Sequence, residues 1–273
     1  PAMAEYTSIL LRHNIAIASM DFIGHGYSQG RCGYVPFYEY LRDDGLIFIL
    51  EVFSKTGLVP FFIQGFSMGG AVAILVSNIL SSSKNKNDSI VWQFNTSEFT
   101  TITRYYRGLI LLAPLTRLVV PPIINWLIDV LAVLFPFETI PQWIYDENIH
   151  NNKSVADKPY LKYIEYDNSL KYSGGLSYGG NLQFATAYSL MKLAEEVEYS
   201  TRYLNKPLIV IYDEADETIE PNSVESFFKS VETSPEYKKI VKIPGGLHNI
   251  LANKCETASK HIINFIKYNL EII

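Results

Sequence analysis

The sequence predicts a protein of the α/β class, with a mostly parallel sheet flanked by helices and an inserted helical cap. Short runs rich in β-branched and aromatic residues alternate with segments of helical length, which is the pattern of parallel strands joined by crossover helices. The predicted strands are Ile15–Met20, Val59–Gln64, Leu109–Ala113, Leu208–Tyr212 and Lys239–Ile243. The predicted covering helices, in which apolar residues recur every three or four positions, are Leu41–Lys55, Ala71–Leu80 and Thr257–Leu270.

The length of the chain fits one core domain with an insertion. One α/β core and a cap can account for 273 residues. The rhythm of strands and helices breaks after residue 115, where Pro121 and Pro122 precede the apolar run Ile123–Phe137. We therefore expect a first part of the core at residues 1–114, a cap at 115–193 and a second part of the core at 194–273.

The charge of the chain excludes nucleic acid as an expected partner. The formal net charge is -5 and the isoelectric point is near 5.6. Neutralising phosphates requires a basic surface, which this composition does not supply. Cys32 and Cys255 have neither metal-ligand spacing nor the density of a disulfide framework. We expect a reducing compartment, no metal and no cofactor.

The sequence gives no sign of export or of a membrane span. Pro1 to Tyr6 lack the charged and then apolar pattern of a signal peptide. The longest apolar stretch, Val119–Phe137, is interrupted by Asn125, Asp129 and prolines, and falls short of a span of about 20 residues. We therefore expect a cytoplasmic protein, with association at a membrane surface as an open alternative.

The strongest functional motif is Gly65-Phe66-Ser67-Met68-Gly69-Gly70. It follows a predicted strand and precedes a predicted helix, so the chain must turn sharply at Ser67. Glycines two residues to either side permit such a turn and raise the serine Oγ above the sheet edge. The motif predicts a nucleophile elbow formed by Gly65, Phe66 and Gly69, with Ser67 as the nucleophile.

Of the five histidines, His248 is placed to act as a base for Ser67. It lies in a turn after the last predicted strand, which is where the elbow architecture requires the base. His13 and His261 lie in helical patterns, and His150 lies in a polar part of the cap. His25 belongs to a Gly-rich turn and is expected to shape that loop.

Four carboxylates follow the predicted strand Leu208–Tyr212, the last but one in the chain. We choose Asp216 as the acid, because a turn of three or four residues brings a carboxylate back beside the base. Asp213 is the alternative, and Glu214 and Glu217 are expected to face solvent.

These residue types fit acyl transfer. His248 would take the proton of Ser67, and the acid would fix the imidazole tautomer and stabilise the imidazolium. The oxyanion needs at least two donors, and the backbone N–H of Met68, the residue after the nucleophile, is expected to be one of them.

Beyond the elbow, four further segments complete a recognisable set: Asp21 to Gly30, Leu112-Ala113-Pro114, Ala215-Asp216 and Gly246-Leu247-His248. Together they resemble the monoacylglycerol lipase and lysophospholipase group of α/β hydrolases, which is related to serine aminopeptidase-like hydrolases. The resemblance spans nearly the whole chain. It implies the α/β-hydrolase fold and a catalytic triad of Ser67, Asp216 and His248.

The same resemblance implies an upstream strand and a His-Gly loop that carries the second oxyanion donor. This sequence starts at Pro1, and Ala4 to His13 already resemble the first helix of the group. We therefore expect the opening strands of the fold, and the second donor, to be missing from the chain. The loss of one donor lowers turnover by about a hundredfold to a thousandfold.

The apolar cap helix predicted at Ile123–Phe135 bears on the substrate. Core packing explains such a helix, and so does a lid that admits acyl chains or touches a membrane surface. We expect a small-molecule lipid ester, either a monoacylglycerol or a lysophospholipid, and transient contact with membranes through the cap. The sequence leaves the oligomeric state undetermined.

Two other functions stay open. A peptidase or amide hydrolase on the same fold would need acidic cap residues to hold a substrate amine, and the candidates are Asp146, Glu147, Glu165 and Asp167. A catalytically impaired hydrolase-like protein is the other, because the oxyanion loop is absent from the sequence.

Overall fold

The computed structural model describes residues 2–81, 96–144, 153–156, 158–169, 178 and 180–271. Within these residues four strands form one parallel sheet in the order β1-β2-β3-β4. The strands are β1 (Phe61–Phe66), β2 (Tyr106–Leu112), β3 (Leu208–Tyr212) and β4 (Lys238–Lys242). Four of the five predicted strands are therefore confirmed: β3 has the predicted ends, and the ends of the other three are shifted by one to three residues. Asp146, Glu147 and His150 lie outside the described residues.

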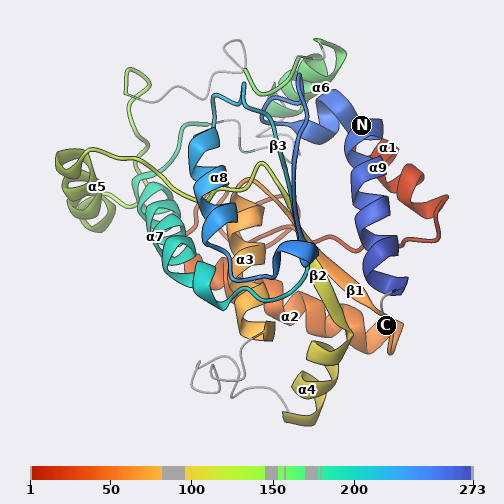
Figure 1. Cartoon of the computed structure of the whole chain (residues 1–273). Coiled ribbons are helices and arrows are strands. Elements are labelled where there is room, and N and C mark those ends of the chain that lie inside the picture. Colours follow the sequence, from red (N-terminus) through yellow and green to blue (C-terminus); the bar gives the residue numbers. More distant parts are fainter. Residues whose placement is uncertain are drawn as a thin grey trace.

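Helices cover both faces of this sheet (Figure 1). On one side α1 (Ala2–Leu11) packs against α9 (Ile250–Glu271), and α9 contacts β2 and β3. On the other side lie α2 (Tyr38–Thr56), α3 (Met68–Ser81), α7 (Phe184–Ser200) and α8 (Pro221–Ser230). A further helix, α4 (Thr96–Tyr105), leads directly into β2. The helices predicted at Leu41–Lys55, Ala71–Leu80 and Thr257–Leu270 are confirmed as parts of α2, α3 and α9.

The core forms around β2, β3 and α3 because these elements are mostly apolar and buried on nearly all sides. Every residue of β3 is buried, and so is each residue of α3 from Gly70 to Leu80. Continuous apolar runs are expected in parallel strands that have helices on both faces. The phenol of Tyr106, at the start of β2, donates to Ser77 Oγ of α3 at 2.6 Å, and burial raises the pKa of Tyr106. A rigid platform thus lies beneath the loops that leave the strands.

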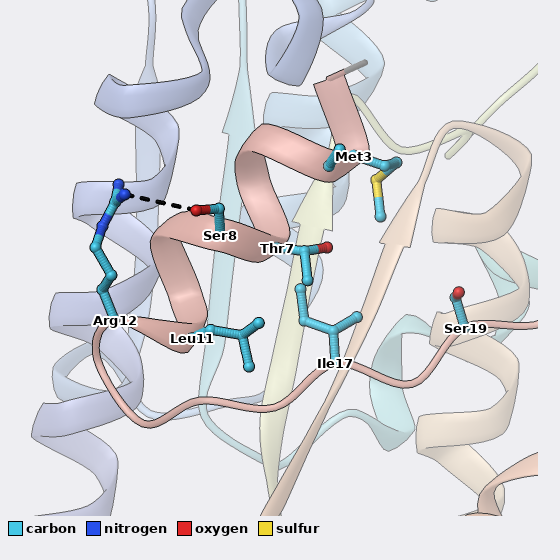
Figure 2. A pocket seen from close by; sticks show the side chains of 8 residues that line it. Met3, Thr7, Ser8, Leu11, Arg12, Ile17 and Ser19 are labelled. Carbon is cyan, nitrogen blue, oxygen red and sulfur yellow. Dashed lines mark hydrogen bonds between the residues drawn. The ribbon is translucent and has the colours of Figure 1, made fainter.

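The strand predicted at Ile15–Met20 is wrong. Ile15 and Ile17 pack against the core, but residues 15–20 belong to no strand or helix. Ile17 and Ser19 line an open cavity of about 870 Å³ together with side chains of α1, and Figure 2 shows Ile17 next to that helix. A segment becomes a strand only when a neighbour shares its backbone hydrogen bonds. Here helix α1 and a cavity lie next to it instead.

The described part of residues 115–193 contains α5 (Pro122–Leu134) and α6 (Lys158–Ser169), in addition to most of α7. A small second apolar cluster joins α5 to the first turns of α7 through Ile128, Ala187 and Met191. Further along α7, Leu193 and Val197 belong to the main core. Helix α7 therefore joins α5 to the main core, and the predicted division of the chain at residues 115 and 193 stays a prediction. No helix in the described ranges is both long and apolar enough to cross a bilayer.

Candidate active site

Three turns at the carboxyl ends of β1, β3 and β4 bring Ser67, Asp216 and His248 together. In a parallel sheet these ends lie at one edge, so residues distant in sequence meet there. The Oγ of Ser67 lies 2.9 Å from Nε2 of His248, and Nδ1 of His248 lies 2.8 Å from Oδ2 of Asp216. A carboxylate can only accept, so a carboxylate at Asp216 places the proton on Nδ1 in a neutral imidazole and leaves Nε2 to accept from the serine hydroxyl.

The turn at Ser67 is built on a strained backbone. Ser67 has a φ of 51°, a region that residues with a side chain rarely adopt. Its N–H donates to the carbonyl of Leu112 at 3.0 Å, and its carbonyl accepts from the N–H of Leu115 at 3.0 Å. The end of β2 therefore holds the serine in place, and its side chain stands at the sheet edge.

Two positions at this turn have no room for a side chain. One of them is the predicted Gly65, but the other is not the predicted Gly69. A Cβ on Gly65 would lie 2.2 Å from the carbonyl oxygen of Gly69, so the site excludes any side chain. Gly69 itself has room, because its Cβ would meet nothing nearer than a ring carbon of Phe22 at 4.0 Å. The second crowded position is Gly70, whose Cβ would lie 2.8 Å from that of Pro114. The steric role assigned to Gly69 thus belongs to Gly70.

The acid turn separates the two candidate aspartates. Both are buried, but it is Asp216 that contacts the imidazole. Its other oxygen, Oδ1, accepts from the N–H groups of Thr218 at 2.7 Å and Ile219 at 3.1 Å, which fixes the carboxylate plane. Asp213 accepts instead from the N–H of Leu247, the residue before the histidine, at 2.8 Å. Glu214 and Glu217 are exposed, as expected.

The His248 turn is also strained, because Leu247 has a φ of 49°, whereas the φ of 77° at Gly245 is one that glycine adopts without cost. His248 is buried, and its ring centre lies 5.0 Å from that of Phe66. The ring of Phe66 therefore packs against the imidazole of His248. The place of Phe66 in the elbow motif did not predict this contact.

The other described histidines lie away from this arrangement. Nδ1 of His25 lies 2.9 Å from the carbonyl oxygen of Ile23, within its own turn. His261 lies in α9, while His13 lies in the turn after α1 and not in the helix that its pattern predicted.

Charged groups brace the flanks of the acid turn. Lys242, at the end of β4, lies 2.5 Å from Glu214 and 2.8 Å from Glu225 of α8. Hydrogen bonds from Lys242 and Tyr212 lower the pKa of Glu225 to about 2. Burial, followed by the hydrogen bond to Glu225, raises the pKa of Tyr212 to about 12. The lysine thus ties β4 to the two segments that follow β3.

Met68 begins α3, directly after the nucleophile. The first N–H groups of a helix lack intrahelical acceptors, and the helix dipole favours negative charge at that end. The Met68 amide is therefore suited to an oxyanion formed on Ser67. Within the described residues, no group of three or more His, Cys, Asp and Glu side chains is arranged to hold a metal ion.

The fold has many counterparts among solved structures. A monoacylglycerol lipase from Paleococcus ferrophilus aligns with a TM-score of 0.68 at 16% identity, over 97% of this chain and 90% of that one. A soluble variant of a monoglyceride lipase from Saccharomyces cerevisiae aligns with a TM-score of 0.58 at 20% identity, over 91% and 74%. A thermophilic esterase from Thermogutta terrifontis gives 0.56 at 20% identity, over 91% and 78%. At these identities the likeness shows the α/β-hydrolase fold.

No curated protein matches the chain in sequence. The family model described as serine aminopeptidase, S33, matches residues 2–91 and 96–255, which is most of the chain. The chain therefore belongs to the serine aminopeptidase S33 family of α/β hydrolases.

Proposed function

We propose that this hydrolase cleaves carboxylic esters through Ser67, His248 and Asp216 by way of an acyl-enzyme. The observation that carries the proposal is the pair of hydrogen bonds through one imidazole, 2.9 Å to Ser67 Oγ and 2.8 Å to Asp216 Oδ2. A serine hydroxyl is a weak nucleophile until a neighbouring base takes its proton, and this base has an acceptor nitrogen directed at the hydroxyl.

The reaction follows from these contacts. Ser67 Oγ attacks the ester carbonyl while its proton passes to His248 Nε2, and Asp216 stabilises the imidazolium that results. The Met68 N–H donates to the oxyanion of the tetrahedral intermediate. His248 then returns the proton to the departing alcohol as the C–O bond breaks, and water releases the acid by the same steps in reverse order.

An apolar surface over the inserted segment supports a lipid substrate. Helix α5 stands out from the body of the molecule (Figure 1), and its partly buried side includes Ile124 and Ile128. Its outer side is apolar as well: Val133 is 80% exposed and Trp126 is 60% exposed. Other exposed apolar residues there are Leu118, Val119, Ile123, Leu127, Leu134, Phe135, Phe137, Trp143 and Ile144. Exposed apolar residues that gather on one helix and its flanking segments are typical of contact with lipid or with another protein.

We propose a monoacylglycerol or a lysophospholipid as the substrate, with α5 and its flanking residues as the surface that meets the acyl chain or the membrane. Both substrate classes combine one ester bond with a long apolar chain and reside in aggregates or bilayers. A surface that dips into such an interface would bring the three-residue site to its substrate.

The substrate class is tested with p-nitrophenyl esters of increasing chain length. Each buried methylene contributes about 0.8 kcal/mol of transfer free energy, so partial burial of a decanoyl chain is expected to raise kcat/KM over the acetyl ester by at least about tenfold. Ser67→Ala serves as the blank for uncatalysed hydrolysis. Equal kcat/KM values for the acetyl and decanoyl esters would contradict an acyl-binding surface.

The contact with lipid is tested by sedimentation with phosphatidylcholine vesicles. The double variant Trp126→Ser, Val133→Asp is expected to reduce the bound fraction at least about fivefold, because it removes apolar area and adds a charge to the surface. Turnover of the water-soluble acetyl ester is expected to stay within about twofold. Leu58→Asp, a change at an exposed residue beside the amino end of β1, is the matched control and is expected to bind like the unaltered protein. Unchanged sedimentation of the double variant would refute the role of α5.

A peptidase or amide hydrolase is the second candidate, favoured by the family that the sequence matches. Glu165 and Asp167 lie on α6, where carboxylates could meet the amino group of a peptide, and the other two candidate carboxylates lie outside the described residues. Amino-acid p-nitroanilides measured beside the ester series distinguish the two candidates. A kcat/KM for the anilides above that of every ester would favour the peptidase.

A further inference from the structure

The side chain of Asn253, near the start of α9, joins the turn at Gly246 to a segment that lies 99 residues before Asn253 in sequence. Its Nδ2 donates to the carbonyl of Gly246 at 2.7 Å and to the carbonyl of Ser154 at 2.9 Å. Its Oδ1 accepts from the N–H of Ala156 at 2.8 Å. Both amide hydrogens and the amide oxygen are thus used, and all three partners lie outside α9. One partner is two residues from His248.

Residues 153–156, which we call the clasp, contact the turns of both the base and the acid. The carbonyl of Ser154 also accepts from the N–H of Asn249, directly after His248, at 3.0 Å. The Oγ of Ser154 lies 3.0 Å from the hydroxyl of Thr218, two residues after Asp216. Lys153 forms an ion pair with Glu217, which lies between Asp216 and Thr218 in sequence. The side chain of Val155 is buried, which anchors the clasp against the molecule.

The turn that the clasp grips is strained and held from two directions. Leu247 has a φ of 49°, and such backbone persists only where the surroundings hold it. From the sheet side, buried Asp213 accepts from the N–H of Leu247 at 2.8 Å. From the outer side, Asn253 donates to the carbonyl of Gly246. Directly after Asn253 the helix is broken, because Lys254 has non-helical angles of φ -143° and ψ 45°. The backbone therefore departs from a regular helix next to the side chain that makes these bonds.

We propose that Asn253 is a positioning residue, which with the clasp holds His248 within reach of Ser67 and Asp216 at the same time. This inference rests on the proposed ester hydrolysis. A base that serves two partners at 2.8 and 2.9 Å tolerates little displacement, and a shift of about 1 Å can lower a rate by about a hundredfold. The clasp lies in the predicted cap. A shift of the cap would therefore change the position of His248 as well as the access of the substrate.

The experiment measures kcat, KM and the pH profile of Asn253→Ala with the preferred ester. We expect kcat to fall by about tenfold to a hundredfold while KM stays within about twofold, because the ester-binding surface is untouched. The acidic limb of kcat/KM is expected to move to lower pH, since a loosened Asp216 contact stabilises the imidazolium less. A role confined to folding would lower the Tm and leave the limb of the remaining active enzyme in place.

Two further variants keep the test decisive. Asn253→Asp has nearly the same volume and retains the acceptor for Ala156 but loses both donated bonds, so it is expected to reproduce the loss in kcat even if Asn253→Ala does not fold. Asn264→Ala, at an exposed asparagine of the same helix, is the matched control and is expected to behave like the unaltered protein. If the unaltered protein neither reacts with a fluorophosphonate nor turns over esters, the proposed function fails. If it does both, and the Asn253 variants match it in kcat and in the acidic limb, the positioning role alone is refuted.

Discussion

Replacing Ser67 by alanine is expected to lower ester turnover by about 10⁴-fold to 10⁶-fold and to abolish covalent labelling by a fluorophosphonate. The change removes the one oxygen that lies 2.9 Å from the acceptor nitrogen of His248. It adds no new strain, since alanine and serine face the same cost at a φ of 51°. The measurements are the initial rate with the preferred ester and the mass of the protein after exposure to the reagent.

The control for this experiment is Ser226→Ala, at an exposed serine of α8 whose hydroxyl donates to the carbonyl of Asn222. It is expected to label and to turn over ester like the unaltered protein. Equal labelling of Ser67→Ala and the unaltered protein would remove Ser67 as nucleophile. A complete absence of labelling in the unaltered protein would favour an impaired hydrolase-like protein.

Replacing Asp216 by asparagine is expected to lower kcat by about 10⁴-fold with little change in the fold. The N–H groups of Thr218 and Ile219 both donate to Oδ1, so the amide oxygen of the new residue is held at that position. Its NH₂ group then faces Nδ1 of His248 and donates to it. The imidazole must carry its proton on Nε2, where it can no longer accept from Ser67. The measurement is kcat with an activated ester across the neutral pH range.

Asp213→Asn separates the two aspartates that the sequence leaves in competition. The amide oxygen of asparagine can still accept from the N–H of Leu247, so the turn of His248 is retained in part. We expect a loss of at most about tenfold in kcat. If Asp213→Asn were as damaging as Asp216→Asn, the assignment of Asp216 as the acid would be untenable.

The fold is predictable from sequence where an element depends on its own residues. The apolar run of β3 can only be a buried strand or a short buried helix. The turn residues that flank it favour the strand. The run Ile15–Met20 has the same kind of composition, yet it forms no ladder. A strand forms there only if a second strand lies beside it. The residues of the run do not determine whether such a neighbour is present.

The candidate site divides in the same way. The elbow is visible in sequence because the turn, its crowded glycines and the serine lie within six residues. The crowding at Gly70 involves Pro114, and the bonds of Asn253 reach back to Ser154, so both depend on long-range packing. The choice between Asp213 and Asp216 is likewise made by the direction of two buried side chains and not by their spacing.

The two borders of the sheet differ in their resistance to self-association. In the part of the chain that the structure describes, β1 is hydrogen-bonded on one side only, and its sequence FFIQGF carries no charge. The opposite border, β4, has the sequence KKIVK, and lysines repel a second chain that approaches it. When molecules meet at high concentration or during refolding, β1 is therefore the border at which strands of neighbouring molecules would align and nucleate aggregates.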